Sequence, residues 1–355
     1  MGKLAMYKFA YFLLIVFTFL LTVISVLGVF VGNVHPRNNL LFCYIGLALP
    51  ALLVICLVML IYWSIKRKVW FLFPLIAIVA NYGYLSAILQ IPLGDGVPPK
   101  GNILKIMTLN TRNFIDDNLE DSANDIKEFL KDESINIVCF QEYRDYVDGR
   151  PERISKFFES DFPYQSITDN VATFSKFPIR KRDYLTFRES NNRAQWVDVE
   201  VGQNQMVRVI NVHMQTTGVN SALHQVSQME EKGISVTTTQ QTGMVTDRMG
   251  HEYVRRAEQA DIIADIVKEV RMPIILCGDF NDTPTSYTYK KLKGRLKDGF
   301  KTAGEGYMYT YRGVKGFMRI DYILHSETLE GVNYYSPERN WSDHNPVIME
   351  INLPE

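Results

Sequence analysis

The segment Ile275-Leu276-Cys277-Gly278-Asp279-Phe280-Asn281-Asp282 places a carboxylate and a carboxamide two residues apart, directly after an apolar run. The run from Pro273 to Cys277 is short and apolar, so it predicts a buried strand, and Gly278 permits a tight turn at its end. In open α/β sheets, ligands bind beyond the carboxyl ends of the strands. Asp279 and Asn281 are therefore candidate functional residues, although an Asp-x-Asn after a strand also occurs as a turn that satisfies its own backbone.

The same pattern recurs along the chain, because several apolar runs carry a polar residue at or next to one end. These segments are Ile106–Asn110, Ile137–Glu142, Val209–His213, Arg319–Leu324 and Ser342–Val347. Each one alone also fits a turn Asn, a capping Asp or a half-buried His. Together they predict one shared polar site, and its oxygen-rich side chains suit Mg²⁺, which takes one or two carboxylates and completes its shell with water and substrate phosphate.

In this order, the segments resemble the endonuclease/exonuclease/phosphatase superfamily, whose members have the DNase I-like fold. The motifs that carry the resemblance are Thr108-Leu109-Asn110, Gln141-Glu142, Phe174–Ile179, Asn211-Val212-His213, Gly278-Asp279-Phe280-Asn281, Arg319–Tyr322 and Ser342-Asp343-His344. The resemblance covers residues 100–355 and implies an α/β protein with a four-layer DNase I-like sandwich.

The resemblance also implies roles for single residues. Glu142 is expected to be the principal ligand of Mg²⁺ (or Mn²⁺), with Asn110 and Asp343 supporting the metal. Asp279 is expected to orient or deprotonate the attacking water, and Asn281 to hold a phosphoryl oxygen.

The remaining candidates would act on charge and on substrate. His344, braced by Asp321, is expected to stabilise charge developing on phosphorus, and His213 is expected on the leaving-group side. Arg256 matches an Arg-x-x-Gln of relatives and is a candidate substrate ligand, while the alternative is a solvated helix face. Phosphoryl transfer asks a protein mainly for positioning and for donors aimed at the phosphoryl oxygens, so this division is physically consistent.

Charge divides the chain into two parts. Residues 1–99 contain six basic residues and one acid, so the remainder carries 32 basic against 38 acidic residues, a net charge of −6. This acidic balance argues mildly against a non-specific nucleic-acid binder, because such proteins attract the polyanion through positive charge.

Three apolar stretches in the first hundred residues, Met6–Val31, Leu40–Ile65 and Val69–Ile91, are each long enough for a bilayer. They predict three transmembrane helices, of which the third is the least regular because it contains Asn81. The first stretch is too long for the apolar part of a signal peptide, the alternative that its two preceding lysines raise.

The positive-inside rule predicts the orientation. With a cytoplasmic N-terminus, Lys3, Lys8 and Lys66-Arg67-Lys68 all lie inside, and only Arg37 lies in the opposite short loop. Three spans then place the catalytic domain outside the cytoplasm, in the periplasm if the anchor lies in the inner membrane of a Gram-negative cell. The four cysteines do not decide the compartment, since Cys139 and Cys277 read as buried free thiols.

The predicted organisation is a membrane anchor (1–93), a Gly/Pro linker (94–99) and a catalytic domain (100–355). Within the domain, residues 125–131 and 253–270 have helical spacing. Residues 216–250 read as a polar, flexible insertion that covers the site or has no function, although Leu223, Val226 and Met229 show a weak helical period.

The sequence therefore predicts a membrane-bound Mg²⁺-dependent phosphoesterase that hydrolyses a phosphodiester in nucleic acid or in a lipid-linked substrate. The alternatives are a phosphomonoesterase for inositol- or sugar-phosphates and a non-catalytic membrane-tethered scaffold. The expected partners are the phosphate ester and, through residues 6–91, the lipid bilayer. The sequence indicates no protein partner.

Overall fold

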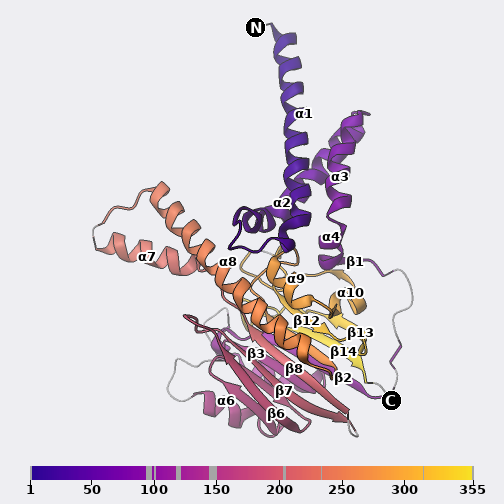
Figure 1. The fold of residues 1–355 in the computed structure, drawn as a ribbon, viewed down its shortest axis with the longest axis vertical. Coiled ribbons are helices and arrows are strands. Elements are labelled where there is room, and N and C mark those ends of the chain that lie inside the picture. The colour runs from indigo at the N-terminus through magenta and orange to yellow at the C-terminus, as the bar shows by residue number, and fades with distance from the viewer. Residues whose placement is uncertain are drawn as a thin grey trace.

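The computed structural model of the chain (Figure 1) describes residues 2–92, 98–99, 101–116, 121–143, 150–202, 205–232, 234–314 and 316–353. Lys100 and residues 94–97 of the predicted linker lie outside the described residues.

The N-terminal part consists of apolar helices that extend away from the rest of the molecule (Figure 1). The helices α1 (Lys3–Leu27) and α2 (Leu41–Ile65) are long and apolar enough to cross a membrane. The third apolar segment is bent by 60° between α3 (Leu72–Ala80) and α4 (Tyr82–Ile88). The described residues thus contain two helices that could span a membrane, or three if the bent pair is one span. The short 3₁₀ helices η1 (Gly28–Asn33) and η2 (Val69–Phe71) lie in the two connections.

Asn81 lies at the bend between α3 and α4. Its buried side-chain amide donates hydrogen bonds to the carbonyl oxygens of Ser25 at 2.8 Å and Ala77 at 2.9 Å. A buried amide is costly unless it is hydrogen-bonded. The polar residue that makes the third segment irregular in sequence therefore marks its break and ties it to α1.

Two six-stranded sheets pack face to face in the catalytic domain. Their orders are β13-β14-β2-β3-β5-β4 and β10-β12-β9-β8-β7-β6, and the pairs β2–β3 and β8–β9 are parallel. The core between them includes Ile106 and Cys139 from the first sheet and Val209 and Cys277 from the second. All four cysteines of the chain are free thiols, as predicted for Cys139 and Cys277.

The first sheet comprises β2 (Ile103–Asn110), β3 (Ile137–Gln141), β4 (Tyr164–Thr168), β5 (Val171–Ser175), β13 (Glu330–Tyr335) and β14 (Val347–Asn352). The second comprises β6 (Ile179–Thr186), β7 (Arg193–Gly202), β8 (Gln205–His213), β9 (Ile274–Asp279), β10 (Lys297–Asp298) and β12 (Asp321–His325).

Helices cover the outer face of each sheet. On the first sheet, α5 (Ala123–Asp132) and α6 (Arg150–Phe158) pack against the strands through Ile126 and Phe158. On the second, α8 (Thr238–Glu269) and α9 (Tyr287–Lys293) pack through Ala260 and Leu292. The layers are helix, sheet, sheet, helix, which confirms the predicted four-layer sandwich. Smaller elements are η3 (Arg112–Phe114) and α10 (Gly299–Ala303).

The prediction of a flexible loop at residues 216–250 is wrong. This segment forms α7 (Val219–Glu231) and the first turns of α8. The side chain of Thr237 accepts a hydrogen bond from the Gln240 amide at 3.3 Å, and Gln240 accepts one from the Thr237 amide at 2.9 Å. This capping box satisfies the exposed amides of the first turn and starts a helix where the polar composition indicated a loop. The weak helical period of Leu223, Val226 and Met229 therefore predicted the structure of this segment better than its polar composition did.

The apolar N-terminal helices and the two-sheet domain are joined by hydrogen bonds. β1 (Leu89–Gln90), which follows α4, pairs with β11 (Gly306–Tyr307) of the catalytic domain. The Tyr44 hydroxyl on α2 donates to the carbonyl oxygen of Thr246 at 2.9 Å. The anchor therefore packs on the enzyme domain as well as preceding it in sequence.

A buried ion pair lies at this joint. The guanidinium of Arg319 donates to the two carboxylate oxygens of Asp298 at 2.6 and 2.8 Å, and to the carbonyl oxygen of Ala87 in α4 at 2.8 Å. Both charged side chains are fully buried. Burial raises the pKa of Asp298, but the charge of Arg319 outweighs it and lowers the pKa below the ordinary 3.8. The pair's stabilisation is thus present at neutral pH and is lost as pH falls from 3.8 towards the lower folded value.

Arg319→Met is expected to destabilise the protein by about 3–5 kcal/mol, because it leaves the Asp298 carboxylate buried and unpaired. The midpoint of thermal unfolding of the full chain in detergent should fall by roughly 10 °C. The double variant Arg319→Met/Asp298→Asn removes both charges and should recover most of the loss. A double variant no more stable than Arg319→Met would contradict this account.

Candidate active site

Polar residues from four strands meet at one edge of the sandwich. Asn110 ends β2, His213 ends β8, Asp279 ends β9, and Glu142 directly follows β3. His213 lies opposite Asp279 in the β8–β9 register. The parallel pairs β2–β3 and β8–β9 each bring two carboxyl ends together, and the packing of the two sheets brings the pairs together.

Asp279 is the centre of this constellation and is 1% exposed. Its carboxylate accepts hydrogen bonds from the Asn110 side-chain amide at 3.1 Å, the Asn281 backbone amide at 2.8 Å and the Asn281 side-chain amide at 3.0 Å. Burial, with the neighbouring Asp321 charge, raises the pKa of Asp279 to about 7. A carboxyl group with this pKa is a suitable general base at neutral pH.

His344 is oriented by Asp321. Its Nδ1 lies 2.9 Å from the Asp321 carboxylate, and its Nε2 lies 3.9 Å from the carboxylate of Asp279. Asp321 starts β12 directly opposite Asp279 in the sheet. Burial lowers the pKa of His344, but the carboxylates of Asp321 and Asp279 outweigh burial and raise it to about 10. This imidazole is therefore cationic at neutral pH.

His213 differs from His344 in its charge. Its Nε2 lies 4.0 Å from the Asp279 carboxylate and 3.7 Å from the Glu142 carboxylate. Burial lowers the pKa of His213, so the ring is neutral. The Asn170 side-chain amide lies 3.1 Å from Nδ1 and donates to it, which leaves the proton of the neutral ring on Nε2. This buried Nε2 has no hydrogen-bond partner among the described residues.

Gly278 has a different role from the one its sequence position indicates. It lies inside β9 with φ of +135°, and a Cβ there would be 2.0 Å from the Val212 carbonyl oxygen of β8. Gly278 therefore permits the close approach of the two strands that carry His213 and Asp279. The turn itself is made by Asn281, whose φ is +52°.

The predicted metal ligands lie beside this cluster of Asp279 and the two histidines. The Glu142 carboxylate, one-third exposed, accepts a hydrogen bond from the Asn110 amide at 3.1 Å. The side-chain oxygen of Asn110 accepts from the Arg112 backbone amide at 3.0 Å, so in this arrangement Asn110 offers donors to the pocket. Asp343 accepts from the Ser342 hydroxyl at 3.3 Å and directly precedes His344.

The site fits a divalent cation by the chemistry of its side chains. One possible ligand atom of each of Asp279, Asp321 and His344 lies within 4.8 Å of the others. The carboxylates of Glu142 and Asp343 lie close enough to act on the two histidines. The second carboxylate oxygen of Asp321 is buried without a hydrogen-bond partner among the described residues. An excess of negative charge and an unsatisfied buried oxygen are what a bound cation would compensate.

Arg256 lies inside the molecule and not on a solvated helix face. Its guanidinium donates to the Asp282 carboxylate at 3.1 Å and to the Gln215 carbonyl oxygen at 2.7 Å. Gln259, one turn later, accepts from the Gln215 backbone amide at 2.9 Å. The Arg-x-x-Gln pair thus clamps the segment that follows His213 to the one that follows Asn281. The role of Arg256 as a substrate ligand stays a prediction, and the contacts indicate a positioning role.

Two residues of the site are absent from the sequence-based set. Asn170 lies in the turn between β4 and β5 and contacts His213, and only the polar Asp169-Asn170 pair between two strands signalled it. The ring of Tyr311 lies 5.1 Å from that of His344, in a segment that no apolar pattern marked.

Comparison with known proteins agrees with this geometry. A family model described as the endonuclease/exonuclease/phosphatase family matches residues 107–344. The chain belongs to this family. A second model, for a domain of unknown function, matches residues 10–88, which are the apolar helices. The search of curated protein sequences gives no match.

Solved structures of the endonuclease/exonuclease/phosphatase family share the fold at low sequence identity. The protein from Bacteroides vulgatus has 17% identity and a TM-score of 0.52, over 72% of this chain and 100% of that one. The protein from Beutenbergia cavernae has 17% identity and a TM-score of 0.51, over 71% and 72%. Truncated TDP2 from Caenorhabditis elegans has 18% identity and a TM-score of 0.50, over 72% and 100%. These similarities establish the fold of the catalytic domain.

Proposed function

We propose that the protein is a membrane-bound, metal-dependent hydrolase of phosphodiesters that acts by attack of water on phosphorus. The observation that carries the proposal is the buried Asp279 carboxylate within 4.0 Å of two imidazoles that differ in charge, a neutral His213 and a cationic His344. Hydrolysis of a phosphoester needs a base for water, a donor for the leaving oxygen and positive charge at the phosphoryl oxygens.

Each residue has a part in this chemistry. Asp279 accepts the proton of the attacking water, held in place by the amides of Asn110 and Asn281. His344, kept cationic by Asp321, stabilises the negative charge on the phosphoryl oxygens. The neutral His213 directs its Nε2–H into the site and stabilises the leaving oxygen by donating a hydrogen bond to it.

A divalent cation completes this proposal. Mg²⁺ or Mn²⁺ would be held by Glu142 with support from Asp343, while Asn110 would support the metal indirectly by orienting the Glu142 carboxylate through its 3.1 Å hydrogen bond. The metal would supply Lewis acidity at the phosphoryl oxygens. The oxygen-rich donor set of the pocket supports a hard cation.

The proposal is tested with the full chain in detergent, because the membrane helices are hydrogen-bonded to the catalytic domain. Bis(p-nitrophenyl) phosphate and p-nitrophenyl phosphate are offered with Mg²⁺ and with a chelator, and the His344→Ala protein is the inactive control. Hydrolysis of the diester that the chelator abolishes is the expected result. Preference for the monoester would favour a phosphomonoesterase, and no turnover of either would favour a binding scaffold.

The catalytic domain is proposed to lie outside the cytoplasm, which in a Gram-negative cell is the periplasm. The positive charges of the anchor support this, as does the position of the N-terminus at the end of the helices away from the catalytic domain (Figure 1). A reporter active only outside the cytoplasm should function when fused after Glu355 and fail when fused after Lys68. The reverse pattern would contradict this orientation.

A further inference from the structure

One loop connects the candidate active site with the membrane helices. We call residues 306–317 the bridging loop, and residue 315 lies outside the part that the structure describes. It begins with β11, which pairs with β1 behind α4. Its large apolar side chains Tyr307, Val314 and Phe317 are 49%, 47% and 53% exposed. Exposed apolar side chains next to membrane-spanning helices are typical of a surface that contacts lipid.

An apolar cavity of about 350 Å³ lies between the bridging loop and the membrane helices. Its walls include Leu53 and Leu57 of α2, Ile78 of α3, Leu85 of α4, and Tyr307 and Phe317 of the bridging loop. Helix residues that would lie in the bilayer therefore form one side of the cavity, and the catalytic domain forms the other.

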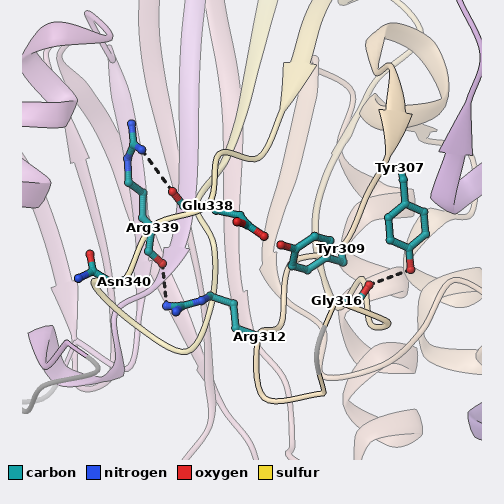
Figure 2. A pocket seen from close by; sticks show the side chains of 7 residues that line it. All are labelled: Tyr307, Tyr309, Arg312, Gly316, Glu338, Arg339 and Asn340. Carbon is teal, nitrogen blue, oxygen red and sulfur yellow. Dashed lines mark hydrogen bonds between the residues drawn. The ribbon is translucent and has the colours of Figure 1, made fainter.

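A polar pocket of about 770 Å³ lies on the other side of Tyr307 (Figure 2). Tyr307 lines both cavities. The polar pocket is also lined by Tyr309, Arg312, Glu338 and Arg339. The guanidinium of Arg339 lies over the rings of Phe129 and Trp341, so the Arg312 guanidinium and the Glu338 carboxylate are the charged groups that remain for the pocket. Figure 2 shows the guanidinium of Arg312 donating to the carbonyl oxygen of Arg339, at 2.8 Å, on the wall opposite the two tyrosines.

The polar pocket shares its wall with the candidate active site. The backbone amide of Arg312 donates to the Asp343 carbonyl oxygen at 2.8 Å, and its guanidinium donates to the Ser342 carbonyl oxygen at 2.8 Å. The preceding residue, Tyr311, places its ring 5.1 Å from the ring of His344. One continuous segment thus borders the apolar cavity, the arginine-lined pocket and the catalytic imidazole.

We propose that the substrate is a phospholipid of the bilayer in which the helices lie, with an acyl chain in the apolar cavity and its headgroup in the arginine-lined pocket. This inference rests on the proposed function and specifies its substrate. The chemistry of the two cavities matches the parts of a phospholipid on either side of its phosphate, because an acyl chain is apolar and the charged side chains of Arg312 and Glu338 suit a polar headgroup. The phosphate itself would lie at the adjoining site of Asp279 and His344, next to Tyr311. One arginine is a small basic surface for a nucleic acid, and the catalytic part of the chain carries a net charge of −6 by the residue counts.

The reaction is a balanced hydrolysis. The oxygen of one water forms a bond to phosphorus, and one ester P–O bond of the phospholipid breaks. Asp279 takes a proton from the water and later returns it to solvent. The departing oxygen accepts a hydrogen bond from the N–H of the neutral His213, takes a proton from solvent and leaves as an alcohol.

The test compares a lipid and a soluble substrate on the full chain. The protein is placed in nanodiscs of phosphatidylethanolamine and phosphatidylglycerol with Mg²⁺, and phosphorus NMR follows the lipid while bis(p-nitrophenyl) phosphate is assayed separately. Leu57→Trp fills the apolar cavity, and Val58→Trp, on the neighbouring exposed side chain outside the cavity lining, is the matched control. We expect Leu57→Trp to lower the ratio of lipid to soluble turnover about tenfold or more, and Val58→Trp to leave it unchanged.

The outcomes separate this inference from the function on which it rests. Hydrolysis of the soluble diester without hydrolysis of any phospholipid overturns the inference and leaves the proposed function standing. Absence of both activities overturns both. Equal losses of lipid turnover in Leu57→Trp and Val58→Trp would contradict an acyl chain in the apolar cavity. Turnover only of DNA or of a polyprenyl phosphodiester would show that the substrate is not a phospholipid. If Leu57→Trp does not fold, native mass spectrometry of the wild-type chain and of Phe317→Asp replaces it. Phospholipid bound to the wild-type chain and lost in Phe317→Asp would support the acyl-chain site, and equal binding by both would overturn it.

Discussion

Replacing His344 with alanine is expected to lower kcat by about 10²–10³-fold, with a much smaller change in KM. The imidazole is buried, held by Asp321 at 2.9 Å and kept cationic, so its charge is directed at the pocket and acts most on the transition state. Single-turnover kinetics of the full chain on bis(p-nitrophenyl) phosphate measures the chemical step directly. Asp321→Asn should have a smaller effect, because it weakens the orientation and keeps the imidazole.

Asp279→Ala is expected to cause a loss of similar size, since it removes the proton acceptor for water. The two losses should be far from additive, because Asp279 and His344 serve one reacting group and lie 3.9 Å apart. The double variant should therefore be little slower than either single one. A near-normal chemical rate in His344→Ala would remove this residue from the mechanism, and fully additive losses would show that the two groups act independently.

Glu142→Gln is expected to abolish metal-dependent hydrolysis while the protein stays folded. The Glu142 side chain is one-third exposed at the end of a strand, so the packing of the fold does not depend on its charge. The binding of a hard cation does depend on this charge. Turnover should fall by at least about 10³-fold at every Mg²⁺ concentration.

A readout independent of activity accompanies this prediction. Mg²⁺ should raise the thermal unfolding midpoint of the wild-type chain, because a ligand that binds only the folded state stabilises it, and it should not do so for Glu142→Gln. Glu128→Gln, an exposed carboxylate on α5, is the matched control and should behave as wild type. Unchanged turnover of Glu142→Gln at saturating Mg²⁺ would refute the metal assignment.

Much of the catalytic domain follows from local sequence patterns. The run Ile274–Asp279 is apolar up to its polar end, and this fixes both a buried strand and the place where a side chain becomes available for chemistry. The same holds for Asn110 and His213. Strand periodicity is a property of neighbouring residues, so the sequence alone carries it.

Local patterns were insufficient where a distant contact or a cap decides the structure. Residues 216–250 form helices because a capping box at Thr237 starts α8 and because α7 buries Ala222 and Val226. The sequence left Arg256 open as a substrate ligand or as part of a solvated helix face, and only its neighbours in space, Asp282 and Gln215, explain its burial.

The sequence by itself determined the family, the apolar anchor and the identity of the polar residues at the strand ends, because each depends on residues close together in the chain. Tertiary structure decided their chemistry. His213 and His344 are the same residue type, yet burial beside Asn170 makes one neutral, and Asp321 and Asp279 make the other cationic. The charge of a buried imidazole is set by groups that surround it in space, and the fold brings those groups from distant positions in the chain: Asn170 is 43 residues from His213, and Asp321 is 23 residues from His344.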